Sequence, residues 1–133
     1  MLDTQIGFLL RKAQQRHLSI FSAHMAEGLT AQQFATLAKL CELGECSQNA
    51  LGRQTAMDNS TMNGVVRRLR ARGLVEKLPA PDDNRMHLLR LTTEGARVVA
   101  RVLPLGHDIT RLTLAPLSGS ERATLLRLLR KIG

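Results

Sequence analysis

Residues 58–91, DNSTMNGVVRRLRARGLVEKLPAPDDNRMHLLRL, decide the fold of this 133-residue chain. Asp58 favours the position just before a helix, because its carboxylate can accept backbone N–H groups of the first turn. The helix that Asp58 opens is predicted to run to Arg72. Gly73 ends it, since glycine readily adopts the left-handed conformation common after a helix.

The rest of this stretch predicts a β-hairpin. Residues 74–78 and 86–91 are short runs with strand-forming side chains. Between them, residues 79–85 contain two prolines, which oppose helix, and Asp and Asn residues, which favour turns. A helix is therefore followed by two antiparallel strands with a turn at their tip.

Three helices are predicted before this stretch. Apolar residues recur at spacings of three and four over residues 4–26, which gives one largely apolar stripe. Thr30 and Gln33 form a capping-box pattern that opens a second helix, closed by Gly44. Ser47 caps a short third helix.

Two more helices follow the hairpin. Thr93 is predicted to cap a long one, which Pro104 kinks or splits. Ser118 and Glu121 form a second capping box in front of a leucine-rich last helix.

The fold class is therefore mainly α with a small β-hairpin wing, in the order of a winged helix-turn-helix. The terminal helices are too apolar to stand alone in water, and pairing with a second copy of the chain buries them.

Charge and composition favour a nucleic-acid partner. Nineteen Lys and Arg residues against eleven Asp and Glu give a net charge of +8, which suits a polyanion. Aromatic residues make up 2%, too few for a β-sandwich or for stacking single-stranded bases. No apolar run is long enough to cross a membrane, and Cys41 and Cys46 are too few for a disulfide framework. We expect a cytoplasmic protein, with Cys41 as a small core residue.

Helical geometry separates the 58–72 helix into two faces. The side predicted to pack inward carries Met62, Val65, Val66 and Leu69. The opposite side gathers the candidates for base contacts, Asn59, Ser60, Asn63 and Arg67, together with Arg70. Asn pairs with adenine and Arg with guanine in a major groove, whereas Arg68 and Arg72 are candidates for phosphate contacts. The competing interpretation is a solvated basic surface.

Two further positions bear on DNA binding. Gly64 costs the helix about 1 kcal/mol relative to alanine, and a close approach of DNA or of a neighbouring helix would explain it. At the hairpin tip, Arg85 is placed to enter a minor groove, and Asp83 to hold its guanidinium. The alternative for Asp83 and Arg85 is a surface salt bridge that only stabilises the turn.

Six blocks of this sequence resemble the MarR family of bacterial transcription regulators. They are Leu29–Phe34, Asp58–Met62, Val65–Leu69, Arg72–Val75, Pro81–Arg85 and Leu91–Gly95. The resemblance implies a homodimer that binds a pseudo-palindromic operator and usually represses. It implies a winged helix-turn-helix over residues 29–92 and dimerisation helices over 1–28 and 93–133, within one domain spanning 1–133. It also matches Arg85 and Asp83 to the family's wing residues.

This sequence departs from the family pattern at three positions. Asn84 stands where a second wing arginine is frequent, which lowers the expected affinity of the wing. Asn63 and Gly64 differ from the commonest recognition helices, which leaves the operator sequence open.

The first predicted helix also resembles the branch of this family that answers to aromatic carboxylates or their thioesters. Arg11 is then the candidate to clamp the acid and His17 to bind a ring hydroxyl. Phe8, Phe21 and Phe34 are candidates to line the pocket. The alternatives are that Arg11 pairs with an acid across the dimer and that His17 and the phenylalanines are core residues.

Enzymatic and metal-dependent functions find little support in the sequence. Its four histidines are scattered, and no Ser/His/Asp arrangement, phosphate-binding loop or metal-ligand spacing is recognisable. We therefore expect no catalytic residues, no metal and no cofactor other than a small aromatic effector. The competing function is a non-specific architectural DNA-binding protein or a helical protein-interaction scaffold.

Overall fold

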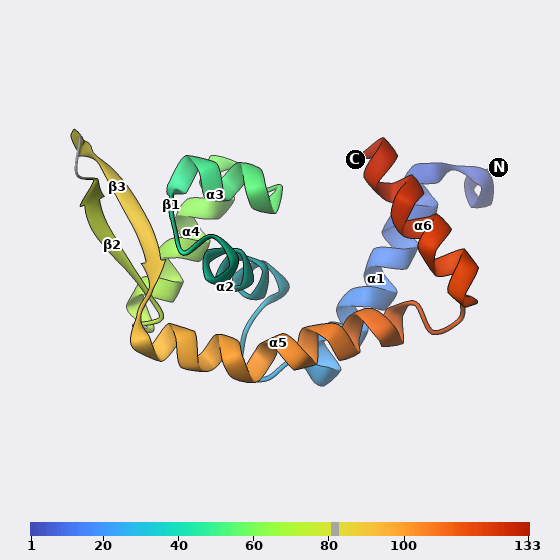
Figure 1. Cartoon of the computed structure of the whole chain (residues 1–133). Coiled ribbons are helices and arrows are strands. Elements are labelled where there is room, and N and C mark those ends of the chain that lie inside the picture. Colours follow the sequence, from blue (N-terminus) through green and yellow to red (C-terminus); the bar gives the residue numbers. More distant parts are fainter. Residues whose placement is uncertain (81–82) are drawn as a thin grey trace. The chain divides into compact units, whose positions relative to one another are not determined.

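The computed structural model describes residues 1–80 and 83–133, with side chains for residues 1–79 and 87–133 (Figure 1). The chain divides into two compact units. One is Met25–Pro104, and the other combines Met1–His24 with Leu105–Gly133. Among the described residues, none of the helices has the length and apolarity that crossing a membrane requires.

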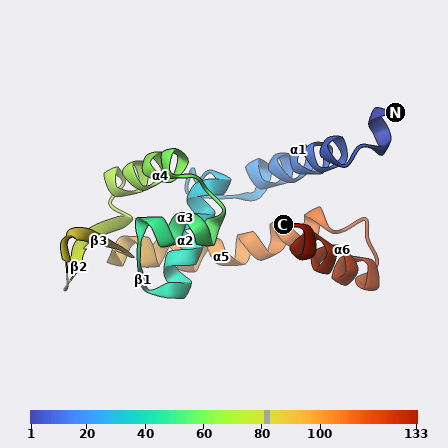
Figure 2. The same cartoon turned by 90° about the horizontal axis from the view of Figure 1, so that it is seen from above.

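The 25–104 unit contains helices α2 (Ala31–Leu43), α3 (Gln48–Thr55) and α4 (Asn59–Ala71) and the first part of α5 (Thr93–Thr113). The capping box that opens α2 is present, with Thr30 and Gln33 bonded to each other's backbone N–H. Leucines at 37, 40, 51 and 69 are fully buried and join α2, α3 and α4 in one core. Figure 2 shows α4 at the margin of this unit.

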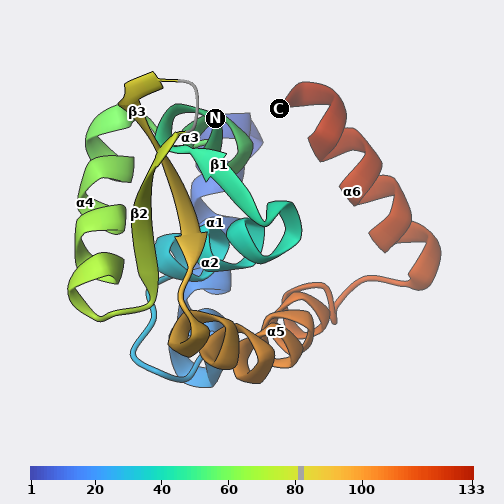
Figure 3. The ribbon, with the colours of Figure 1, turned by 60° about the vertical axis from the view of Figure 1, so that its left-hand side comes forward.

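A three-stranded antiparallel sheet completes the unit, with the spatial order β1 (Glu45–Ser47), β3 (Asp83–Leu91), β2 (Val75–Ala80) (Figure 3). The sequence predicted the hairpin but not β1, a three-residue strand. Arg90 on the central strand pairs in register with Glu45 and with Glu76. Its Nε lies 2.5 Å from Oε1 of Glu76, and its Nη1 lies 3.9 Å from Oε1 of Glu45.

The predicted strand boundaries were wrong by a few residues. β2 begins at Val75 and continues to Ala80, so Pro79 lies inside a strand and pairs with His87. A proline is tolerated there because β2 is an edge strand, whose outward N–H groups need no partner in the sheet.

The start of α5 also differs from the prediction. Thr92, not Thr93, is the capping residue, since its Oγ1 accepts from the N–H of Gly95 at 3.0 Å. The backbone N–H of Thr92 in turn donates to the carbonyl of Leu74 at 3.1 Å. A Cβ added at Gly95 would lie 2.0 Å from that carbonyl oxygen, so only glycine fits. Pro104 lies inside α5 without splitting it.

The other unit contains a short 3-10 turn (Leu2–Thr4), helix α1 (Ile6–His24), the end of α5 and helix α6 (Gly119–Ile132). Arg16 on α1 holds the C-terminal end of α5, donating to the carbonyls of Thr113 at 2.5 Å and Leu112 at 3.1 Å. The capping box that opens α6 is present between Ser118 and Glu121, and its hydrogen bonds lower the pKa of Glu121.

Several apolar side chains of this second unit are exposed in the single chain. Of the stripe predicted on the first helix, Ile6, Leu9 and Leu10 are exposed, whereas Phe21 is buried.

The expectation that Cys41 is a core residue was wrong, because its side chain is exposed at the end of α2. Cys46 is half-buried, and burial raises the pKa of its thiol.

Candidate nucleic-acid interface

Helix α4 has one buried face, as the sequence predicted. Asp58 caps it, because Oδ1 accepts from the N–H of Thr61 at 2.7 Å, and this bond lowers the pKa of the carboxyl group. The four residues predicted to pack inward are all buried: Met62, Val65, Val66 and Leu69. This packing fixes the rotation of α4 about its axis, and so fixes which residues face solvent.

The exposed side of α4, here called the basic face, consists of Asn59, Ser60, Asn63, Arg67, Arg68 and Arg70. Residues 59–71 include no acidic residue. The basic face therefore offers amide and hydroxyl groups near the helix start and guanidinium groups toward its end. Amide, hydroxyl and guanidinium groups are the kinds of group that contact base edges and phosphates in DNA-binding proteins, and residues 59–71 include no carboxylate that would repel a polyanion.

A polar groove of about 570 Å³ follows the basic face. Its lining combines Gln32, at the start of α2, with Ser60, Asn63, Arg67 and Arg68 of α4. The groove thus joins residues predicted for base contacts with one predicted for phosphate contacts.

Gly64 lies beneath the side chain of Arg68. A Cβ added at Gly64 would lie 3.0 Å from Nη1 of Arg68, and among the described residues, apart from the backbone of α4, it would meet only this guanidinium within 4 Å. A neighbouring helix therefore does not explain the glycine. The glycine allows Arg68 to fold back along α4, and a close approach of DNA stays a prediction.

Asn63 is tied to the preceding helix. Nε2 of Gln48, the first residue of α3, donates a hydrogen bond to Oδ1 of Asn63. Gln48 was not among the predicted site residues. The sequence did predict the Ser47 cap, and this cap places Gln48 at the start of α3.

Arg72 has a structural partner. Its Nη2 donates to the backbone carbonyl of Glu27 at 2.6 Å, and the carboxylate of Glu27 lies 2.6 Å from Nη1 of Arg101. Glu27 has a positive φ of 63°, so two arginines hold a residue in the left-handed conformation. The phosphate contact expected of Arg72 stays a prediction.

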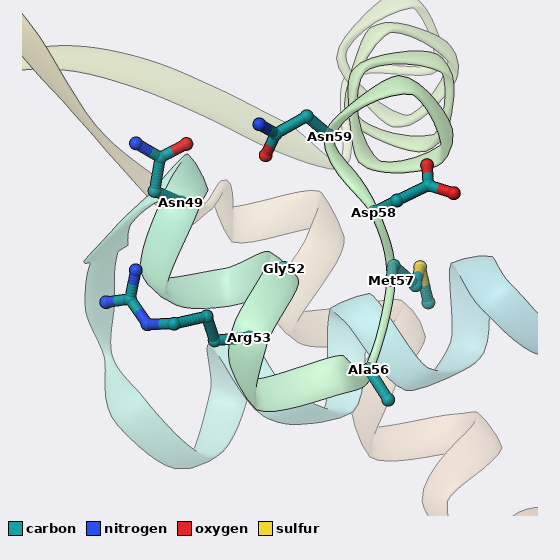
Figure 4. A pocket seen from close by; sticks show the side chains of 7 residues that line it. All are labelled: Asn49, Gly52, Arg53, Ala56, Met57, Asp58 and Asn59. Atoms are coloured by element: carbon teal, nitrogen blue, oxygen red, sulfur yellow. The ribbon is translucent and has the colours of Figure 1, made fainter.

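The turn between α3 and α4 encloses a second polar pocket, of about 530 Å³ (Figure 4). Ala56 turns the chain with a positive φ of 56°, and the N–H of Met57 donates to the carbonyl of Gly52 at 2.9 Å. Figure 4 shows the amides of Asn49 and Asn59 at one side of this turn. Asn59, predicted for base contacts, thus lines the same pocket as Asn49 of α3.

The two predicted wing residues, Asp83 and Arg85, lie outside the part of the chain whose side chains are described. β3 begins at Asp83. Their contact with each other and with a minor groove stays a prediction.

The candidate effector residues lie on two helices. Phe8, Arg11, His17 and Phe21 are on α1, and Phe34 is on α2. Nδ1 of His17 lies 2.9 Å from Oγ1 of Thr113, and its ring centroid lies 6.5 Å from that of Phe21. Arg11 is exposed, and Phe8 and Phe34 are half-buried.

His17 and Thr113 also line an apolar pocket of about 350 Å³ within the second unit, together with Leu10 of α1, Leu114 just after α5 and leucines of α6. Arg11 is not part of its lining. Arg16, one turn beyond Arg11 on α1, is engaged with carbonyls of α5. Within the described residues, no group of three His, Cys, Asp or Glu side chains is placed to hold a metal ion.

A helix-turn-helix followed by a β-hairpin, with a basic outer face on its second helix, defines a winged-helix DNA-binding protein. Comparison with known proteins identifies the family. Residues 29–87 match the model of the MarR family. The HTH-type transcriptional repressor NicR of Pseudomonas putida is 42% identical over 129 residues, which cover 96% of this chain and 82% of that protein.

Two solved structures agree closely with this one. A probable transcriptional regulator from Pseudomonas aeruginosa has a TM-score of 0.97 and 45% identity, with 100% of both chains covered. BpsR of Bordetella bronchiseptica, whose DNA binding is regulated by 6-hydroxynicotinic acid, has a TM-score of 0.93 and 39% identity, covering 97% of this chain and 93% of its own. The chain therefore belongs to the MarR family and is a DNA-binding transcriptional regulator.

Proposed function

We propose that this protein is a cytoplasmic, dimeric repressor that binds a pseudo-palindromic operator and is released from it by a small aromatic carboxylic acid. The observation that carries the DNA-binding part is the acid-free basic face of α4, which packing of Met62, Val65, Val66 and Leu69 turns toward solvent. This arrangement suits a helix that lies in a major groove.

The residues of this face divide by chemistry. Asn59, Ser60, Asn63 and Arg67 contact base edges, since amides and guanidinium groups form the bonds that distinguish base pairs. Arg68 and Arg72 position the protein on the phosphate backbone, and the wing residue Arg85 enters the minor groove with its guanidinium held by Asp83. Residues 29–92 form the DNA-binding part.

A second copy of the chain covers the exposed apolar residues of α1 and α6, the first and last α-helices of the chain. Ile6 on α1 and Ile132 on α6 are 63% and 66% exposed, and leucines of both helices are also exposed. Apolar area of this kind is costly in water and is typical of an obligate interface. Two copies related by a two-fold axis then present two α4 helices to two half-sites of an operator.

The proposed effector is an aromatic carboxylic acid that binds near α1. The regulated DNA binding of BpsR by 6-hydroxynicotinic acid supports an aromatic acid as ligand for this chain. Arg11, an exposed guanidinium on α1, is the proposed carboxylate clamp. His17 is the proposed partner of a ring substituent, and its hydrogen bond to Thr113 orients the imidazole.

The DNA-binding part is tested by selecting preferred duplexes from a randomised pool at physiological salt. A repressor enriches a two-fold site and prefers it strongly over random DNA. Arg67→Ala then relaxes the preference at one base pair of each half-site, whereas Arg68→Ala weakens binding to all sequences and reduces its salt dependence. Equal binding to every duplex with a steep salt dependence would instead identify an architectural protein.

The effector part is tested by thermal unfolding of the protein with a panel of benzoates, hydroxybenzoates, cinnamates and pyridine carboxylates. A ligand that binds only the folded state raises the melting temperature. The acid that does so is expected to release the selected duplex, and Arg11→Ala is expected to abolish both effects. An unchanged melting temperature across the panel argues against an aromatic acid and leaves the DNA-binding part intact.

A further inference from the structure

Gln48 of α3 is hydrogen-bonded to Asn63, a residue in the middle of the basic face of α4. Its Nε2 donates to Oδ1 of Asn63, which joins the two helices of the helix-turn-helix through their side-chain amides. We propose that Gln48 determines base preference jointly with Asn63, so that the two linked amides contact one base pair as a unit. This inference rests on the proposed function and deepens it.

Both ends of the bond are held in place by the starts of their helices. Ser47 caps α3 through the N–H of Ala50, which makes Gln48 the first residue of that helix. Asp58 caps α4 through the N–H of Thr61, and Asn63 lies one turn further on. The two amides therefore meet between two fixed backbone segments, and little freedom is lost when DNA binds.

The hydrogen-bonded pair is accessible from the solvent side of α4 through Asn63. Gln48 is half-buried, and Asn63 is exposed and lines the polar groove with Ser60 and Arg67. The hydrogen bond therefore ties an amide that lines the groove to a half-buried amide at the start of α3, next to the groove residues that are the other candidates for base contacts.

The direction of the hydrogen bond predicts the base. Because Gln48 engages Oδ1 of Asn63, the pair presents Nδ2 of Asn63 as a donor and Oε1 of Gln48 as an acceptor. Adenine presents an acceptor, N7, beside a donor, the N6 amino group, in the major groove. An isolated asparagine supplies both partners itself, whereas here Gln48 supplies the acceptor. The geometry therefore points to an A·T pair contacted by two residues.

The test measures base preference of the full-length protein on its selected duplex, with every substitution at each half-site position. Gln48→Ala and Asn63→Ala are each expected to reduce the preference for adenine at the same position, on the order of tenfold. Combining them is expected to add no further loss, because either change breaks the unit. Gln54→Ala removes an exposed glutamine from the same helix and serves as the matched control, with unchanged preference.

Gln48→Glu tests the direction of the bond. A carboxylate accepts from Nδ2 of Asn63 and turns Oδ1 toward the base, which is expected to shift preference toward cytosine, whose N4 amino group is a donor. Unchanged preference in Gln48→Ala, or losses that multiply in the double variant, would overturn the inference and leave the repressor proposal standing. A wild-type protein that binds all duplexes equally would overturn both.

Discussion

Arg72 donates from Nη2 to the carbonyl oxygen of Glu27 at 2.6 Å, so the residue that follows α4 is bonded to the turn that precedes α2. Arg101 of α5 holds the carboxylate of the same glutamate at 2.6 Å. One residue therefore connects the end of the candidate recognition helix to α5, and both contacts lie within the 25–104 unit.

Arg72→Ala is expected to lower the free energy of unfolding by about 1 kcal/mol, because it removes this hydrogen bond from the end of α4. Chemical denaturation at a fixed protein concentration measures the loss, with Arg70→Ala, an exposed arginine of the same helix, as control. If Arg72 served only as a phosphate contact, the variant would lose DNA affinity while keeping the wild-type stability.

Gly95→Ala is expected to lower the free energy of unfolding by about 2 kcal/mol or more, because the new methyl group would lie 2.0 Å from the carbonyl of Leu74 and force α5 away from it. Gly119→Ala is the control, since a Cβ at that position in α6 meets no atom within 4 Å. Thermal unfolding compares the two. A Gly95→Ala protein as stable as its control would contradict the packing described for the start of α5.

Gly64→Ala is expected to separate stability from DNA binding. Alanine favours the helix by up to about 1 kcal/mol over glycine, and the obstructing atom is the end of a flexible arginine, which can move aside. The variant is therefore expected to unfold at a higher temperature. Displacing Arg68 is expected to weaken binding to all duplexes equally, and a change of base preference at one position would show that Gly64 itself approaches a base.

Asp58 is expected to make α4 sensitive to acid. The hydrogen bond from the N–H of Thr61 lowers the pKa of Asp58 in the folded protein. The stability that the ionised cap adds is therefore fully present above the pKa of an unfolded aspartate, about 4. It is lost as the pH falls through the lower pKa of the folded state. Asp58→Asn keeps a capping side chain that does not titrate. Unfolding curves between neutral pH and pH 3 are expected to show a smaller loss of stability for this variant than for the wild type.

The sequence predicted most of the fold because the decisive signals are local. The capping residues Thr30, Ser47, Asp58 and Ser118 each set the start of a helix, and hydrophobic spacing placed the buried face of α4. β1 escaped prediction because three residues carry no pattern, and the strand exists only through its pairing with residues 88–90.

The candidate site was less accessible to sequence reasoning than the fold. Composition and spacing identified the basic face, but not its links to other elements. The bond from Gln48 to Asn63 joins residues fifteen positions apart, and that from Arg72 to Glu27 spans forty-five. Such partners depend on how helices pack, which no local spacing encodes. The exposure of Cys41 was missed for the same reason, since a small apolar residue fits either face of a helix.

The position of Pro79 has a consequence for the behaviour of the protein in solution. An open sheet exposes N–H and C=O groups along its outermost strands, and these can recruit strands of other molecules into aggregates. Here one outermost strand, β1, has only three residues, and the other, β2, carries a proline that cannot donate a hydrogen bond. The wing can therefore remain a small open sheet at the high local concentrations reached along DNA, because neither of its margins is a good template for a strand from another molecule.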